Sequence, residues 1–254
     1  MIKMKALLMH IAADTSDIGT VGICGPIFEN KNFEFIPIKE AKPTSETRTY
    51  KSLVSRNKKF GRSLSYFVPS DIQNDIIHYD PDFDHFTYSD PVNSLRGNML
   101  RNLQRGDFIF FVASLVQFRK DIYTNNIRKV ISAKQKGKMV KYIIGYFEIT
   151  KILSLEKNNN DLKVLGQKIP ISKYYSQVKH NAHYKRTRDR FTIAIGKKDR
   201  KNALLSKAIP LTSQGSPFKP NNFARKIYGN VTFPRGFKMI REESKINTLL
   251  EKIK

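Results

Sequence analysis

The segment 78–90 concentrates the residue types that metal and acid–base chemistry require. It reads HYDPDFDHFTYSD, and the wider stretch 71–90 holds six aspartates and no lysine or arginine. Carboxylates clustered with imidazoles can bind a divalent metal, which is the usual requirement of a nuclease. The same residues are ordinary turn formers, so a turn-rich loop without a catalytic role is the alternative interpretation. We predict Asp80, Asp82 and Asp90 as catalytic residues, with a divalent metal as cofactor if the protein is a nuclease.

A second cluster, HNAHYKR at 180–186, combines two histidines with basic residues. Two histidines three apart could share a metal on a helix, but no third ligand lies near them in the sequence. The surrounding run, 173–201, holds ten Lys and Arg residues. Such a run favours contacts with phosphate or a base edge, and a solvated basic loop is the alternative. We predict His183 as a catalytic residue. The predicted nucleic-acid-binding residues of this run are Asn181, Lys185, Arg186 and Arg188.

The charge of the whole chain points to a polyanionic partner. Its 254 residues carry 46 Lys and Arg against 22 Asp and Glu, a formal net charge of +24. Such an excess repels itself in the folded state, and nucleic-acid binding explains it better than a lysine-rich proteome does. The run 119–141 contributes eight Lys and Arg against one acid, and from it we predict Lys134, Lys136 and Lys138 as nucleic-acid-binding residues.

Membrane attachment and secretion are not expected. No apolar run approaches the ~18 residues of a membrane-spanning helix, and no signal peptide or lipidation motif is found. The single Cys24 excludes an internal disulfide and indicates a reducing, cytoplasmic setting.

The elements that must position these residues are mainly strands. Residues 106–113 and 142–149 are aromatic and β-branched runs, and we predict that they are neighbouring strands of one sheet, with the basic run 119–141 extending from it. Gly145 inside the second run predicts a bulge or a close backbone approach. Further strands are predicted at 4–12, 33–38 and 191–196, helices at 95–103 and 241–254, and loops at 14–25 and 212–222. We expect one α+β domain over residues 1–254.

The strand pair GDFIFF (106–111) and YIIGYFEI (142–149) resembles the central strands of PUA-like barrels, the superfamily that contains the EVE, ASCH and YTH domains. The resemblance implies a PUA-like mixed β-barrel core with a few short helices and basic insertions. It also implies binding of RNA or DNA, in several of these domains with a flipped, modified base held in an aromatic pocket.

A wider pattern runs through most of the chain. In order, its segments are FEFIPIKE (33–40), HYDPDFDHFTYSD (78–90), GDFIFF (106–111), YIIGYFEI (142–149), NAHYKR (181–186) and SKAIPLT (206–212). This pattern resembles the nucleotide modification associated domain family, third type, and implies a role in the modification of DNA bases or in its recognition. Ser89 stands where the T-Y-G-D form of the pattern has glycine. The positions that the resemblance singles out are Glu40, Asp80, Asp82, Tyr88, Asp90, Asn181, His183 and Lys207.

Together these observations predict a nucleic-acid-binding protein, with DNA favoured over RNA, that recognises or processes modified nucleotides in a modification or restriction context. The alternative is a nucleic-acid enzyme, either a nuclease or a base-modifying enzyme of a restriction–modification system. A third possibility is a basic structural or ribosome-associated protein. In the first two cases an acidic island in so basic a chain needs cationic compensation, so the two clusters should meet in one cleft, with Tyr88 and Lys207 contacting nucleic acid. The residues expected to converge are Asp80, Asp82, Tyr88, Asp90, Asn181 and His183.

Overall fold

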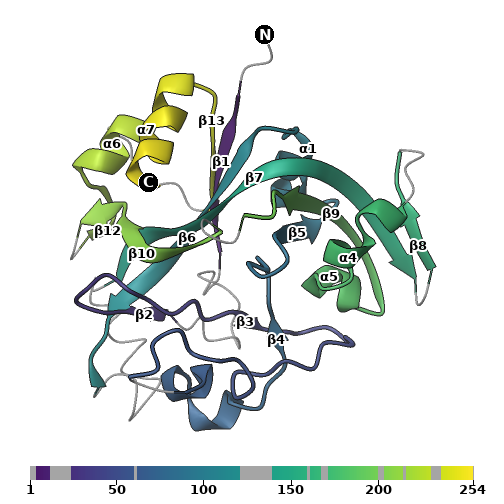
Figure 1. The fold of residues 1–254 in the computed structure, drawn as a ribbon, viewed down its shortest axis with the longest axis horizontal. Coiled ribbons are helices and arrows are strands. Elements are labelled where there is room, and N and C mark those ends of the chain that lie inside the picture. The colour runs from purple at the N-terminus through teal and green to yellow at the C-terminus, as the bar shows by residue number, and fades with distance from the viewer. Residues whose placement is uncertain are drawn as a thin grey trace.

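The structure, a computed structural model, is built around one curled sheet that forms part of a barrel (Figure 1). It describes residues 4–11, 24–59, 62–120, 139–158, 161–166, 171–199, 203–213, 216–229 and 236–253. The strands are β1 (Ala6–His10), β2 (Gly25–Ile27), β3 (Ile38–Lys39), β4 (Ile77–His78), β5 (Thr87–Pro91), β6 (Phe108–Gln117), β7 (Met139–Asn158), β8 (Asp161–Val164), β9 (Arg188–Gly196), β10 (Leu204–Pro210), β11 (Thr212–Ser213), β12 (Ser216–Pro220) and β13 (Phe237–Ile240).

Helices are few and short. They are α1 (Leu95–Arg101), α4 (Tyr175–Val178), α5 (Ala182–Lys185), α6 (Asn222–Tyr228) and α7 (Glu243–Ile253), with single 3-10 turns η1 (Leu64–Phe67), η2 (Ser70–Ile72) and η3 (Ile171–Lys173). The helices predicted at 95–103 and 241–254 are therefore confirmed as α1 and α7. The mixture is an α+β fold dominated by strands. Within the described ranges, no helix has the length and apolar character needed to cross a membrane.

The main sheet has the order β13-β1-β6-β7-β9-β5, with β2 added to β6 and with β8 and β10 added to β7. The β1–β6 and β2–β6 pairs are parallel, and the other pairs are antiparallel. The predicted strands at 4–12 and 191–196 are β1 and β9. Because β5 pairs with β9 along its whole length, the acidic segment and the basic run that precedes β9 are brought together.

The two runs predicted to be neighbouring strands, 106–113 and 142–149, are β6 and part of β7, and they pair antiparallel as expected. Gly145 lies opposite Phe111, where the register shifts, so the bulge is confirmed as well. A Cβ atom on Gly145 would stand 2.2 Å from the Ala203 carbonyl oxygen and 2.6 Å from the Phe83 ring. Only glycine fits at this position, because a backbone oxygen and an aromatic ring both approach it too closely for a Cβ atom.

Successive residues of β1 and β6 point to opposite faces of the sheet, because side chains alternate along a strand. Leu7 and Phe111 belong to the core on one face. Leu8 and Phe110 belong to the core on the other face, which α6 and α7 cover (Figure 1). Both faces are therefore buried, which explains why these runs are apolar at almost every position.

Two predicted elements differ from the structure. Residues 33–38 are mostly irregular, with a two-residue strand β3 at the end. The side chains of residues 33–37 are buried, whereas Ile38 is 42% exposed. The Glu34 carboxylate accepts from the Ser55 hydroxyl at 2.7 Å and from the backbone N–H groups of residues 56 and 57. The predicted loop at 212–222 contains the hairpin β11–β12. Its prolines are tolerated because a two-stranded hairpin consists entirely of edge strands.

Parts of several predicted segments lie outside the described residues. The longest are 14–23 of the first predicted loop and 121–138 of the basic run, which contains Lys134, Lys136 and Lys138. The shorter ones are residue 12, residues 200–201, residues 214–215 and residue 254.

Candidate functional site

Eight polar residues from three distant parts of the chain meet beside the β5–β9 pair, and we call them the polar cluster. Seven of them are buried, and Asp189 is half-buried, with 7% of its side chain exposed. Glu40 follows β3, while His78 ends β4 and is followed two residues later by Asp80. Since side chains two apart on extended backbone point the same way, His78 and Asp80 both face the cluster. The members are Glu40, His78, Asp80, Ser89, Asn181, His183, Arg186 and Asp189.

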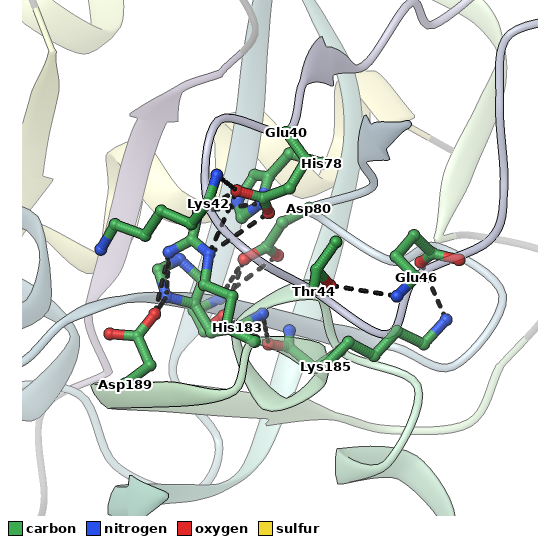
Figure 2. Close-up of polar contacts among 12 residues, drawn as sticks. Glu40, Lys42, Thr44, Glu46, His78, Asp80, His183, Lys185 and Asp189 are labelled. Carbon is green, nitrogen blue, oxygen red and sulfur yellow. Dashed lines mark hydrogen bonds and ion pairs between the residues drawn. The ribbon is translucent and has the colours of Figure 1, made fainter. Parts of the chain in front are cut away.

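Arg186 joins the carboxylates of Glu40 and Asp189, two residues that Figure 2 labels. Its Nη2 donates to Glu40 Oε1 at 3.0 Å, and its Nη1 donates to Asp189 Oδ2 at 2.9 Å. All three side chains are nearly excluded from solvent. A guanidinium with two rigid donor edges suits such bridging, whereas an ammonium would serve one carboxylate at a time.

Each carboxylate also holds one histidine. Nδ1 of His78 lies 2.7 Å from Glu40 Oε2, and Nδ1 of His183 lies 2.9 Å from Asp189 Oδ2. Arg186 approaches the same two nitrogens at 3.3 and 3.1 Å. A carboxylate accepts and a guanidinium donates, so the shorter carboxylate contacts place a proton on each Nδ1. Both imidazoles are therefore held in the tautomer with the lone pair on Nε2.

Asp80 is linked to the second histidine through Ser89 and Asn181. Asp80 Oδ2 accepts from the Ser89 backbone N–H at 3.0 Å, and the Ser89 hydroxyl lies 2.7 Å from both Asp80 Oδ2 and Asn181 Oδ1. The Asn181 oxygen also accepts from the backbone N–H of His183, where it caps the start of α5. One hydroxyl proton serves one acceptor, so both Ser89 contacts are hydrogen bonds when Asp80 carries a proton.

Burial and these contacts shift the pKa values within the cluster in opposite directions. Burial raises the pKa of Asp80 well above its usual value, against hydrogen bonds from Ser89. Burial also lowers the pKa of His183 to about 4, although Asp189 opposes this. In contrast, the pKa of Glu40 falls to about 2. Burial raises this pKa, but hydrogen bonds from His78 and Arg186 lower it by more. The pKa of Asp189 is lowered by His183 and Arg186 in the same way. At neutral pH the cluster combines ionised carboxylates with a neutral His183.

The segment 40–46 crosses the cluster (Figure 2). The backbone N–H of Ser45 donates to the Lys185 carbonyl at 2.8 Å, and Thr44 forms an isolated bridge with Arg186. Glu46 accepts from Lys185 Nζ at 2.8 Å and from Arg48. This segment therefore links Glu40, the first residue of the cluster in the sequence, to the residues around Arg186.

The structure brings together three of the six residues expected to converge, namely Asp80, Asn181 and His183. Asp82 is fully buried and accepts from the backbone N–H groups of residues 84 and 85 as well as lying 3.0 Å from the His85 ring nitrogen. Asp90 accepts from Tyr88 at 3.3 Å and from Ser94. The Tyr88 ring is buried against Phe111, so this conformation does not offer it to a base.

Some of the basic residues predicted to bind nucleic acid form internal ion pairs, and others are exposed at the surface. Arg186 is inside the cluster and Lys185 pairs with Glu46. Arg188 and Lys207 are exposed, on β9 and β10 respectively. Sequence analysis included His78 in the candidate metal-binding segment without selecting it as a site residue, and it placed no function on Asp189. Their signals were modest: a His-x-Asp pair on extended backbone, and an aspartate three residues after a basic residue.

A separate hollow of about 730 Å³ lies near the start of the segment that follows β6. The rings of Phe28 and Phe118 line it, 5.1 Å apart between centroids. Arg56 stands over the Phe33 ring at 5.1 Å and donates to the Leu205 carbonyl. Amide side chains and further cations complete the lining, which is formed by Asn30, Asn32, Asn57, Lys59, Gln117 and Lys120 among others. Its volume is within the ordinary range for a small-molecule site.

The sequence profile of the family described as nucleotide modification associated domain 3 matches residues 5–242. This match covers most of the chain, so the protein belongs to the nucleotide modification associated domain 3 family. It includes every segment that contributes to the polar cluster, and it links the chain to modified nucleotides. Searches among curated proteins and among solved structures found no significant match.

Proposed function

We propose that this protein binds nucleic acid, DNA in preference to RNA, and recognises or processes a modified nucleotide at the polar cluster. The observation that carries the proposal is the meeting of Glu40, His78, Asp80 and His183 in one buried site whose segments all lie within the family match. The pKa values of Glu40, Asp80 and His183 are shifted, and groups with shifted pKa values that are gathered in this way are typical of functional sites. The cluster contains carboxylate and imidazole groups, which can discriminate between base edges once the buried site opens.

Two further features support nucleic acid as the partner. The formal net charge of +24 favours a polyanion, Arg188 is an exposed cation on β9, which leads from the cluster, and Lys207 is an exposed cation on β10. The hollow beside Phe28 and Phe118 combines aromatic rings, amides and cations, a lining that suits an unstacked nucleotide.

A second candidate function is a nucleic-acid enzyme, either a nuclease or a base-modifying enzyme. One geometric observation favours it. His183 holds its lone pair on Nε2 while Asp189 accepts from Nδ1, which is the arrangement of a general base and the residue that orients it.

The experiment that separates the candidates compares wild type with Asp80→Asn on duplex DNA, single strands and RNA, each with and without modified bases. If the cluster recognises a modification, Asp80→Asn should remove the preference for modified strands and retain general affinity. If it is an active site, the variant should retain binding and lose turnover. His180→Ala is the matched control, because this ring stacks on His85 outside the cluster. Absence of nucleic-acid binding at low salt would overturn the proposal.

A further inference from the structure

The geometry points to a metal site: we propose that His78, Asp80 and His183 bind one divalent transition-metal ion. One potential ligand atom from each of these buried residues lies within 4.8 Å of the other two. Ligands on one ion with bonds of about 2.0–2.2 Å stand about 3–4 Å apart, so closing the site takes side-chain movements of about 1 Å. Among the described residues, no other group of three or more histidines, cysteines or acids brings its potential ligand atoms this close together.

The unused nitrogens of the two imidazoles are the strongest support. Nδ1 of His78 and of His183 each face a carboxylate. Among the described residues none makes a hydrogen bond with Nε2 of either ring, and neither nitrogen is among the fully enclosed polar atoms that lack a partner. A lone pair that meets no donor and is not fully enclosed is available to an ion, which would bind both rings at once.

The carboxylates behind the histidines complete the pattern of a metal centre. Metal-binding imidazoles typically donate their other N–H to a carboxylate, which fixes the tautomer and the ring orientation. Glu40 and Asp189 occupy these outer positions, and Arg186 fixes both carboxylates. Asp80 is held through Oδ2 by Ser89, which leaves Oδ1 with one long contact of 3.3 Å. The third ligand atom is therefore also oriented and accessible within the cluster.

The donor set indicates the class of metal. Two imidazole nitrogens and one carboxylate oxygen suit Zn²⁺ or Fe²⁺, with open positions for water or substrate. Mg²⁺ and Ca²⁺ prefer oxygen ligands throughout. Charge agrees with a divalent ion, because with Asp80 ionised on the metal the three carboxylates and one guanidinium would leave two negative charges for the ion to compensate. The inference rests on the site of the proposed function and changes its enzymatic candidate: with Nε2 of His183 on the metal, a metal-bound water rather than His183 would act as the base.

The test uses the full chain, stripped with a chelator and titrated with Zn²⁺, Fe²⁺ under argon, and Mg²⁺ by calorimetry, without nucleic acid. We expect one ion per chain for Zn²⁺ or Fe²⁺, and an affinity for Mg²⁺ at least about 100-fold lower. Asp80→Asn and His183→Ala should each weaken binding at least about 100-fold, and the positioning variant Asp189→Asn about 10-fold. Circular dichroism of each variant without metal checks that it is folded.

His180→Ala is the control for adventitious binding by exposed imidazoles, and it should keep wild-type affinity. The Co²⁺ complex of the wild type provides a measurement that needs no variant, because ligation by protein nitrogen and oxygen changes its visible absorption from that of the aqua ion. Loss of binding in His180→Ala but not in Asp80→Asn would overturn the proposal, as would an aqua-like Co²⁺ spectrum. Either result would leave nucleic-acid recognition to be judged by its own experiment.

Discussion

Arg186 is the residue on which the polar cluster depends. Its guanidinium is the cation that separates Glu40 from Asp189, and these two carboxylates hold the two histidines. Because all of these groups are buried, water cannot replace a missing partner. The compensation of negative charge in the cluster therefore depends on the Arg186 side chain.

Replacing Arg186 with alanine should lower the free energy of unfolding by about 3–5 kcal/mol, because two buried carboxylates lose their compensating charge. Arg186→Lys should lie between this variant and wild type, since lysine keeps the charge but cannot bridge both carboxylates. Urea unfolding at pH 7 provides the measurement. The control is Arg190→Ala, whose pair with Glu156 spans 3.6 Å and is 57% and 42% exposed. Its expected cost is at most about 1 kcal/mol, and an equal cost for both alanine variants would contradict the prediction.

Glu46 should make stability depend on pH. Burial would raise the pKa of Glu46, but hydrogen bonds from Arg48 and Lys185 outweigh it and lower the pKa from 4.5 to about 2. A lowered pKa in the folded state means that the stabilisation is complete above the unfolded value and is lost as pH falls toward the folded one. Glu46→Gln should therefore cost about 1–2 kcal/mol at pH 7, with the difference from wild type shrinking between pH 4.5 and 2.

The measurement for Glu46 is chemical unfolding of both proteins at several pH values. Glu242→Gln is the matched control, because its pair with Lys245 leaves the carboxylate 65% exposed. A Glu46→Gln cost that is unchanged as the pH falls through this range would contradict the assignment.

Single residues were predicted from the sequence where their chemistry is local. Asp80, Asn181 and His183 stood out because they lie in segments of unusual composition. His78 lies in one of these segments but was not selected, because its partners His183 and Arg186 are more than a hundred positions away in the sequence. Asp189 was not selected, because its contacts depend on a turn whose shape the sequence does not show. Tyr88 shows the opposite error. An aromatic residue beside acids suggests stacking on a base, but its strand places the ring in the core.

At the scale of elements, Gly145 determines how closely β7, β10 and the acidic segment can pack. Gly145→Ala should lower the free energy of unfolding by about 2–4 kcal/mol, because the new methyl group meets both a backbone oxygen and the Phe83 ring. Thermal and urea unfolding measure the change. Gly166→Ala is the control: its φ of 71° is strained for alanine, but nothing lies within 4 Å of the new Cβ. Its cost should be about 1 kcal/mol, and a similar cost at Gly145 would contradict the packing argument.

Elements were predictable where burial on both faces made whole strands apolar. For this reason β1, β6, the stretch 142–149 of β7 and the stretch 191–196 of β9 were recognised from the sequence. The segment 33–38 is also largely apolar, but its backbone is paired only locally, a difference that composition does not record. The backbone N–H of Glu34 donates to the Pro26 carbonyl, and the Pro37 carbonyl accepts from the Tyr50 hydroxyl. The hairpin β11–β12 was missed because prolines and glycine usually mark loops, and only pairing partners reveal an edge strand.

For the whole molecule, the charge predicts how binding to nucleic acid should respond to salt. The logarithm of the association constant for DNA should fall linearly with the logarithm of salt concentration, by about 0.9 per phosphate contact. Arg188→Ala and Lys207→Ala should each reduce this slope by up to about 1 if the exposed cations on β9 and β10 contact phosphate. Lys245→Ala, on α7 and in an ion pair with Glu242, is the control. A slope near zero in fluorescence titrations would show that the charge does not serve nucleic-acid binding.

The length of β7 also has a thermodynamic consequence. Its first half packs into the two large cores through Ile143, Ile144 and Phe147, and its second half packs into a third cluster through Leu153 and Leu155. One strand of 20 residues therefore contributes to three hydrophobic clusters, and β9, which leads directly from the polar cluster, is hydrogen-bonded along its second half. β6 pairs with residues 139–148 of the same strand, so the ladders of the scaffold and of the site share one continuous backbone. Site and scaffold should consequently unfold as one cooperative unit, with a single calorimetric transition and with amide protection that is continuous along β7.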